Sequence, residues 1–111
     1  MKVRDLIEKL NFRLITEETT LDKEITGLYY GDLLSWVMSH AKQGNAWITV
    51  QTHVNIIAVA TLIEMSCIIV PESIEIDPET INRANQENIT LISTNLNAYE
   101  IFCKIYELGL R

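Results

Sequence analysis

The sequence predicts an α/β fold: a single compact domain with a mainly parallel sheet of about four to five strands covered by helices. The length of 111 residues fits one domain and leaves no room for a second. Short apolar segments, typical of buried strands, alternate with helical segments from residue 25 to residue 109. No internal repeat, heptad run or linker interrupts this alternation.

The chain opens with a predicted helix and a short strand. Helical spacing of apolar residues predicts an amphipathic helix over residues 2–11, and these residues are Val3, Leu6, Ile7 and Leu10. Residues 12–16 are a strand candidate, and residues 17–23 form a polar connection. We therefore divide the domain into an N-terminal helix and strand, residues 1–20, and a core, residues 21–108.

The core begins with a strand and a helix. Residues 25–30 are rich in strand-forming side chains, and Gly31 interrupts the pattern. Asp32 is the expected N-cap of a helix that runs to about residue 42. Glycine and asparagine at positions 44–45 then end that helix.

Two apolar strands and an apolar helix follow. Residues 46–50 form a buried strand, and residues 67–70 form another that ends at Pro71. Residues 54–65 read as a helix that is apolar on nearly every side. Such a helix is either enclosed by other elements or buried at a subunit interface.

The last third of the chain carries clear helix signals. Residues 77–87 begin with Asp-Pro-Glu, which supplies an N-cap, a proline at N1 and a first-turn carboxylate. Residues 90–93 are a strand. Asn97 and Glu100 have capping-box spacing, and Gly109 ends the final helix. The apolar stripe of that helix consists of Ala98, Ile101, Ile105 and Leu108.

Composition excludes several functions. A formal charge of −6 argues against nucleic acid as a partner, because phosphate backbones require clustered Lys and Arg. Residues 43–63 contain no charged side chain, but many polar ones interrupt them, so we expect no membrane span. Cys67 and Cys103 lack metal-ligand spacing and read as buried thiols of a cytoplasmic protein.

Signatures of catalysis are absent from the sequence. It contains no phosphate-binding loop, dinucleotide fingerprint or nucleophile elbow. The histidines, His40 and His53, are not paired with acids at ligand spacing. We therefore expect no enzyme, no metal and no cofactor.

Polar loops nevertheless follow three of the predicted strands. If these strands are parallel, their loops meet at one edge of the sheet, where α/β folds bind ligands. We expect a groove there that binds a small polar ligand. The candidate ligand-binding residues are Gly31, Asp32, Gln51, Thr52, His53, Asn55, Ser93 and Thr94. The alternative is that these side chains only cap helices and satisfy loop backbone.

The order and spacing of several segments resemble the DRTGG domain. These segments are Leu21–Gly27, Gly44–Thr49, Asn55-Ile56, Ile68–Val70, Asp77–Glu79 and Leu91–Thr94. The opening helix and strand are similar to the start of the related N-terminal domain of HPr kinase/phosphorylase. The chain departs at two motifs: Gln51–Asn55 replaces Gly-Asp-Arg-x-Asp, and Pro71–Ser73 replaces Thr-Gly-Gly.

The resemblance implies a regulatory domain rather than an enzyme. Members are attached to phosphotransacetylases or lie between CBS domains of pyrophosphatases regulated by adenine nucleotides, and they tend to form dimers. Stand-alone members accompany hydrogenases and sensor proteins. Our leading hypothesis is thus a cytoplasmic, homodimeric regulatory or sensory domain that binds a small polar ligand such as a nucleotide. The alternative is an interaction subunit that docks onto a redox enzyme, such as a hydrogenase, or onto a sensor kinase, without a small ligand.

Overall fold

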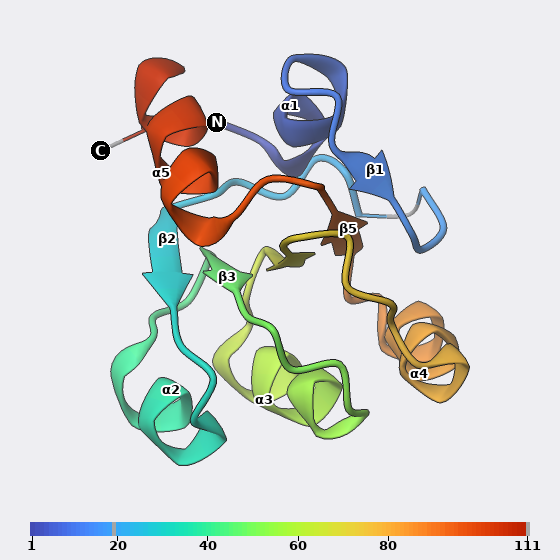
Figure 1. Cartoon of the computed structure of the whole chain (residues 1–111). Helices are drawn as coiled ribbons and strands as arrows, with labels where there is room; N and C mark the ends of the chain where they lie inside the picture. The colour runs from blue at the N-terminus through green and yellow to red at the C-terminus, as the bar shows by residue number, and fades with distance from the viewer. Residues whose placement is uncertain (19, 111) are drawn as a thin grey trace.

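The computed structural model describes residues 1–18 and 20–110. Within these residues five strands form one sheet with the order β1-β5-β4-β3-β2 (Figure 1). Strands β2 to β5 are parallel to one another, and the short β1 runs antiparallel to β5. The strands are β1 (Arg13–Leu14), β2 (Gly27–Tyr30), β3 (Asn45–Ile48), β4 (Cys67–Val70) and β5 (Leu91–Ser93). The predicted α/β class with a mainly parallel sheet is confirmed.

The helices cover both faces of the sheet. Helices α2, α3 and α4 connect successive parallel strands and lie on one face, whereas α1 and α5 lie on the other (Figure 1). Because β2 to β5 lie side by side in chain order, right-handed crossovers place all three connecting helices on the same side. The helices are α1 (Val3–Glu8), α2 (Leu34–His40), α3 (Asn55–Ile63), α4 (Pro78–Glu87) and α5 (Ala98–Glu107).

Alternate strand residues supply the two halves of the core. Trp47 and Ile68 pack with α2, α3 and α4, whereas Ile48 and Ile69 pack with α1 and α5. Every residue of β4 is fully buried, which explains its uninterrupted apolar run.

The apolar helix α3 lies between α2 and α4. Its residues Ile56, Ile57 and Ala60 are buried against the sheet, whereas Ala58 and Leu62 are exposed, so one face of this helix is enclosed and the other is open. The uncharged segment 43–63 thus divides into β3, a loop and α3. In the described part of the chain, no helix is long and apolar enough to cross a membrane.

The starts of α4 and α5 lie where the sequence predicts them, although the N-cap Asp77 of α4 makes no side-chain capping bond. Pro78 stands at the start of α4, and α5 begins with the predicted capping box. Asn97 Oδ1 accepts from the Glu100 amide at 2.9 Å, and Glu100 Oε1 accepts from the Asn97 amide at 3.1 Å. The first helix is shorter than predicted and ends at Glu8, because the chain turns at Asn11, whose φ is +58°.

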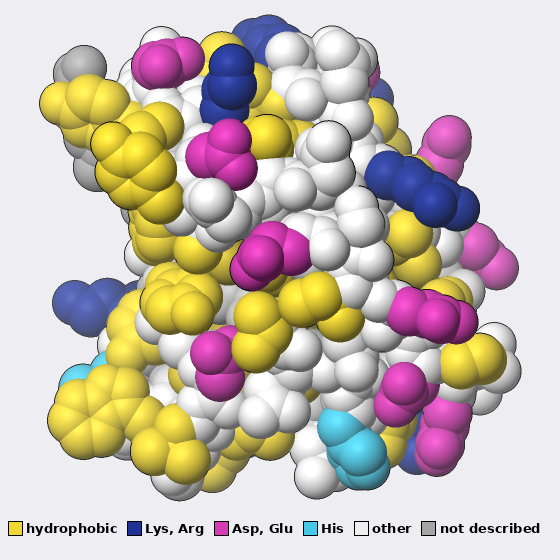
Figure 2. All heavy atoms as spheres, in the orientation of Figure 1, with side chains coloured by type: hydrophobic (Ala, Val, Ile, Leu, Met, Phe, Trp, Pro, Cys, Tyr) yellow, Lys and Arg dark blue, Asp and Glu magenta, His cyan; other side chains and the backbone are white. Residues whose placement is uncertain are grey.

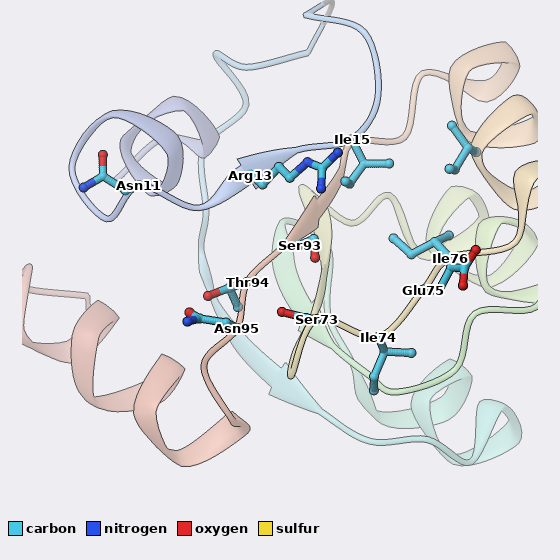
Figure 3. A pocket seen from close by; sticks show the side chains of 11 residues that line it. Asn11, Arg13, Ile15, Ser73, Ile74, Glu75, Ile76, Ser93, Thr94 and Asn95 are labelled. Carbon is cyan, nitrogen blue, oxygen red and sulfur yellow. The ribbon is translucent and has the colours of Figure 1, made fainter.

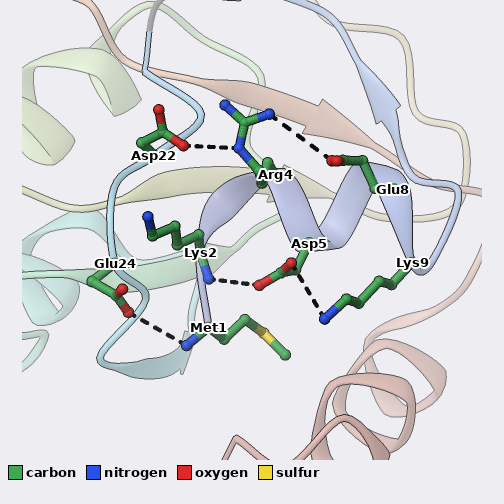
Figure 4. A network of polar contacts seen from close by, with 8 residues as sticks. All are labelled: Met1, Lys2, Arg4, Asp5, Glu8, Lys9, Asp22 and Glu24. Carbon is green, nitrogen blue, oxygen red and sulfur yellow. Dashed lines mark hydrogen bonds and ion pairs between the residues drawn. The ribbon is translucent and has the colours of Figure 1, made fainter.

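A network of ion pairs ties α1 to the segment before β2 (Figure 4). Arg4 Nε donates to Asp22 Oδ1 at 2.8 Å, and the amino group of Met1 lies 3.4 Å from Glu24 Oε2. The hydrogen bond and charge of Arg4 hold the pKa of Asp22 below its usual value. The network thus fastens the N-terminal helix to the core.

We expect Asp22→Asn to remove a pH-dependent part of the stability. A carboxyl group with a lowered pKa stabilises the fold above its usual pKa, and this contribution is lost as the pH falls through the folded value. Urea unfolding at neutral and at acidic pH measures the effect: the variant is slightly less stable at neutral pH only. The exposed carboxylate of Glu75, changed to Gln, is the control. An equal pH profile for the two variants would contradict the prediction.

Burial protects the thiol of Cys67. Desolvation raises its pKa to about 12, because the side chain is enclosed between β4 and the α1/α5 face. We expect no alkylation of Cys67 in the folded protein at mildly alkaline pH, where ordinary thiols react. Mass spectrometry of the alkylated chain, with and without concentrated urea, tests this. Rapid labelling of Cys67 without urea would show that the thiol is accessible.

Candidate functional site

After the neighbouring strands β4 and β5, the chain continues toward opposite faces of the sheet. The connections after β2, β3 and β4 lead to the α2–α4 face, whereas the connection after β5 leads to α5 on the other face (Figure 1). The loops after β4 and β5 therefore diverge at the carboxyl edge of the sheet. Ligands of open α/β sheets bind preferentially at such a divergence.

A pocket of about 440 Å³ lies beside these diverging loops. Its walls come from the β1 region, the loop after β4, the start of α4 and the loop after β5 (Figure 3). The lining consists of two kinds of residue, polar or charged ones and isoleucines. The polar ones are Asn11, Arg13, Ser73, Glu75, Ser93, Thr94 and Asn95, and the apolar ones are Ile15, Ile74, Ile76 and Ile81.

Arg13 supplies a positive charge in this lining. It is exposed on β1 and stands directly opposite Ser93 of β5 in the strand register. Ser73 and Asn95 approach from the loops after β4 and β5, and Glu75 lies farther along the loop after β4 (Figure 3). A guanidinium group beside hydroxyl and amide groups suits an anion such as phosphate.

Backbone hydrogen bonds hold the two loops of the pocket together. The amide of Glu72 donates to the carbonyl of Leu96, and the amide of Ser73 donates to the carbonyl of Thr94, both at 2.9 Å. Glu72 and Ser73 have φ values of +59° and +52°, a left-handed conformation that glycine adopts most easily. These residues stand where the DRTGG pattern has two glycines, so the backbone keeps a glycine-like shape without glycine.

Asp32 joins the loops after β2 and β3. Its Oδ1 accepts from Thr49 Oγ1 at 2.8 Å and from the Val50 amide at 2.9 Å. The side chain of Gln51 donates to the carbonyl of Asp32 at 3.1 Å, and Trp47 Nε1 donates to the carbonyl of Gly31 at 2.9 Å. The two loops thus satisfy one another's polar groups.

The expectation that Asp32 caps α2 is wrong. The N-cap is Leu33, which makes no side-chain capping bond. Asp32 lies one residue too early, and its carboxylate turns across to the neighbouring loop.

Thr52, His53 and Asn55 form the turn into α3. The carbonyl of Thr52 accepts from Thr80 Oγ1 at 2.6 Å, which links this turn to α4. The exposed His53 accepts from the Asn55 amide through Nδ1 at 3.2 Å. These contacts order the start of a helix.

The structure therefore divides the residues for which the sequence predicts one shared groove. The loops carrying Gly31 and Asp32 and those carrying Gln51 to Asn55 lie together. Ser93 and Thr94 line the pocket beside Arg13, and none of the other six lines that pocket. Asn95 belongs to the same polar stretch as Ser93 and Thr94, whereas the sequence analysis does not single out Asn11, Arg13 or Ser73. No pattern in the chain reveals that β1 pairs with β5 and brings Arg13 to this edge.

Few groups in the described residues suit a metal. No cluster of three or more potential ligands occurs among them. His40 stacks on Trp36 with ring centroids 3.8 Å apart, and Cys67 is enclosed in the core.

Replacing Asp32 tests whether its side chain stabilises the two loops as a hydrogen-bond acceptor. Asp32→Ala leaves the buried Thr49 hydroxyl and the Val50 amide without their acceptor, so we expect a loss of about 1–3 kcal/mol. Asp32→Asn retains an oxygen at the Oδ1 position, which accepts both bonds, and should cost much less. Urea unfolding measures both. Equal losses for the two variants would show that the charge, and not the acceptor, matters.

Comparison with known proteins identifies the fold. The model of the DRTGG domain family matches residues 5–108. A similar solved structure contains the CBS and DRTGG domains of the regulatory region of Clostridium perfringens pyrophosphatase, complexed with the activator diadenosine tetraphosphate. It aligns with a TM-score of 0.67 and 16% identity over 88% of this chain and 43% of that chain. Among curated proteins, none matches this sequence significantly.

The family match covers nearly the whole chain. In the pyrophosphatase the DRTGG domain is part of the regulatory region. Because the match extends over residues 5–108, nearly the whole chain, this chain belongs to the DRTGG domain family.

Proposed function

We propose that this domain regulates a partner activity by binding a phosphate-containing small ligand, such as an adenine nucleotide, in the pocket between β1 and the loops after β4 and β5. Its family membership and the activator-bound regulatory region of similar fold support the proposal. The observation that carries it is the position of Arg13 in a 440 Å³ pocket where the chain diverges to both faces of the sheet.

The two kinds of lining suit the two parts of a nucleotide. Arg13 would bind the phosphate, and the hydroxyl groups of Ser73 and Ser93 would add hydrogen bonds. The isoleucine side chains supply an apolar surface for a base. Thr94 Oγ1 already accepts from the Leu96 amide at 3.2 Å, but its proton is available for donation.

The remaining candidate residues have structural roles in this proposal. The Asp32 carboxylate and the Gln51 side-chain amide are bonded to neighbouring protein groups, and the carbonyls of Gly31 and Thr52 accept bonds from Trp47 and Thr80. His53 stands where the family pattern has an arginine. In this proposal Arg13 binds the phosphate, so no arginine is required at position 53.

We propose in addition that the domain is a cytoplasmic homodimer, in which free thiols such as Cys67 remain reduced. A second candidate function is docking onto another protein, such as a hydrogenase or a sensor kinase. The exposed aromatic side chains of Trp36 and Tyr99 favour a macromolecular contact of some kind.

Calorimetric titration with ATP, ADP, diadenosine tetraphosphate and inorganic phosphate tests the ligand site. Loss of a hydrogen bond to a charged group weakens binding by about 10-fold to 100-fold, which is our expectation for Arg13→Ala. Arg83→Ala is the matched control, because that exposed arginine on α4 lies 4.0 Å from Glu87 and outside the pocket.

Two results would contradict the proposal. The first is the absence of binding heat for all four ligands at millimolar concentration. The second is binding that Arg13→Ala and Arg83→Ala weaken to the same extent, because this would reflect overall charge and not the pocket.

A further inference from the structure

We infer that a second copy of this chain binds at the free edge of β2, so that the two sheets join in one continuous sheet across a two-fold axis. The inference rests on the proposed homodimer and names its surface. We call this the β2-edge surface, and it consists of Leu28, Tyr30, Leu33, Trp36, Tyr99, Phe102 and Tyr106.

Strand β2 is the unprotected end of the sheet. It pairs with β3 on one side and has no strand on the other among the described residues. Its four residues, Gly27–Tyr30, include neither proline nor a charged side chain. Natural proteins usually protect such edges with these devices, so an edge that lacks them is suited to pairing with another strand.

Helix α5 carries a second apolar stripe beside the edge. Its inner stripe packs on the sheet, whereas Tyr99, Phe102 and Tyr106 recur at helical spacing on a different side. With Leu28 of β2 they line an apolar groove of about 420 Å³. Tyr99 is 76% exposed, although it adjoins the apolar groove.

Helix α2 continues the apolar surface on the opposite face of the sheet. Leu33 is 67% exposed and Trp36 is 56% exposed at the start of this helix. Figure 2 shows several hydrophobic side chains on the side of the molecule that α5, β2 and α2 form in Figure 1, with a Lys or Arg side chain projecting between them.

A single two-fold rotation accounts for the free edge of β2, the outer apolar stripe of α5 and the exposed apolar side chains of α2. A two-fold axis perpendicular to the sheet pairs β2 antiparallel with β2 of the second copy. Such a rotation keeps each face of the sheet on its own side. It therefore places α5 beside the second α5 on one face and α2 beside the second α2 on the other. A self-complementary surface of this kind indicates a copy of the same chain rather than an unrelated protein.

The exposed area matches that of a stable dimer. Four aromatic side chains that are about half-exposed or more present roughly 100 Å² each, and the exposed Leu33 adds a similar area, so the β2-edge surface offers on the order of 500 Å² of apolar area. Standard interfaces bury about 800 Å² per partner, of which roughly two thirds is apolar in homodimers. None of the seven residues carries a charge, so the net charge of −6 on each copy is not concentrated at the contact.

Sedimentation velocity across micromolar concentrations tests the inference. We expect wild type to sediment as a dimer of the 12.7 kDa chain, and Tyr99→Lys and Trp36→Lys each to raise the dimer Kd by about 100-fold or more. Leu62→Lys is the matched control, since Leu62 is 69% exposed on α3 and lies outside the surface. Circular dichroism checks that every variant is folded.

Cys103 provides a second measurement without any substitution, because it lines the groove beside Tyr99. Its alkylation rate should fall as the concentration of wild-type protein rises. Monomeric wild type overturns both the dimer and its surface. A dimer that both lysine variants leave intact overturns the surface alone. The nucleotide titration remains a separate experiment, because the pocket and the β2-edge surface share no residue.

Discussion

The burial of the sheet on both faces is the constraint on which the rest of the structure depends. Parallel strands require crossover connections, and a sheet enclosed on both sides requires helices on each face. Here three successive crossovers place α2, α3 and α4 on one face, so the other is left to α1 and α5. To reach that second face, the chain must change sides after β5. The pocket lies where this change occurs.

The sequence predicts the elements well because each has a local cause. Continuous apolar residues mark β4, and the capping box marks the start of α5. The order of strands has no local cause, because it depends on which buried faces fit together. The candidate site likewise combines residues that a local pattern marks with residues that only the tertiary structure brings there. Ser93 and Thr94 follow a recognisable strand, whereas Arg13 reaches the pocket only through the pairing of β1 with β5.

Asp32 illustrates a further reason why sequence patterns fall short. An acidic residue before a helix is a frequent N-cap, and the pattern alone cannot show a competing acceptor role. In the structure, the neighbouring loop offers two donors to the same carboxylate oxygen. Tertiary hydrogen bonding therefore outweighs local capping at this position. The same reasoning assigns a structural role to the loops after β2 and β3.

The proposed ligand pocket and the β2-edge surface lie toward opposite ends of the sheet. The pocket borders β1 and β5, whereas the second copy would pair with β2. Hydrogen-bonded strands connect the two ends without interruption. In the proposed function, ligand binding and dimerisation thus use different parts of one continuous sheet.

The left-handed backbone at Glu72 and Ser73 bears on how such a domain diversifies. The amides of these residues are bonded to the loop after β5, so the turn persists although side chains have replaced the hydrogens of glycine. The path of this turn thus depends on its backbone hydrogen bonds and not on the side chains that it carries. A turn fastened through its own amides can therefore present a different side chain at position 73 to the pocket while the path of the backbone stays the same.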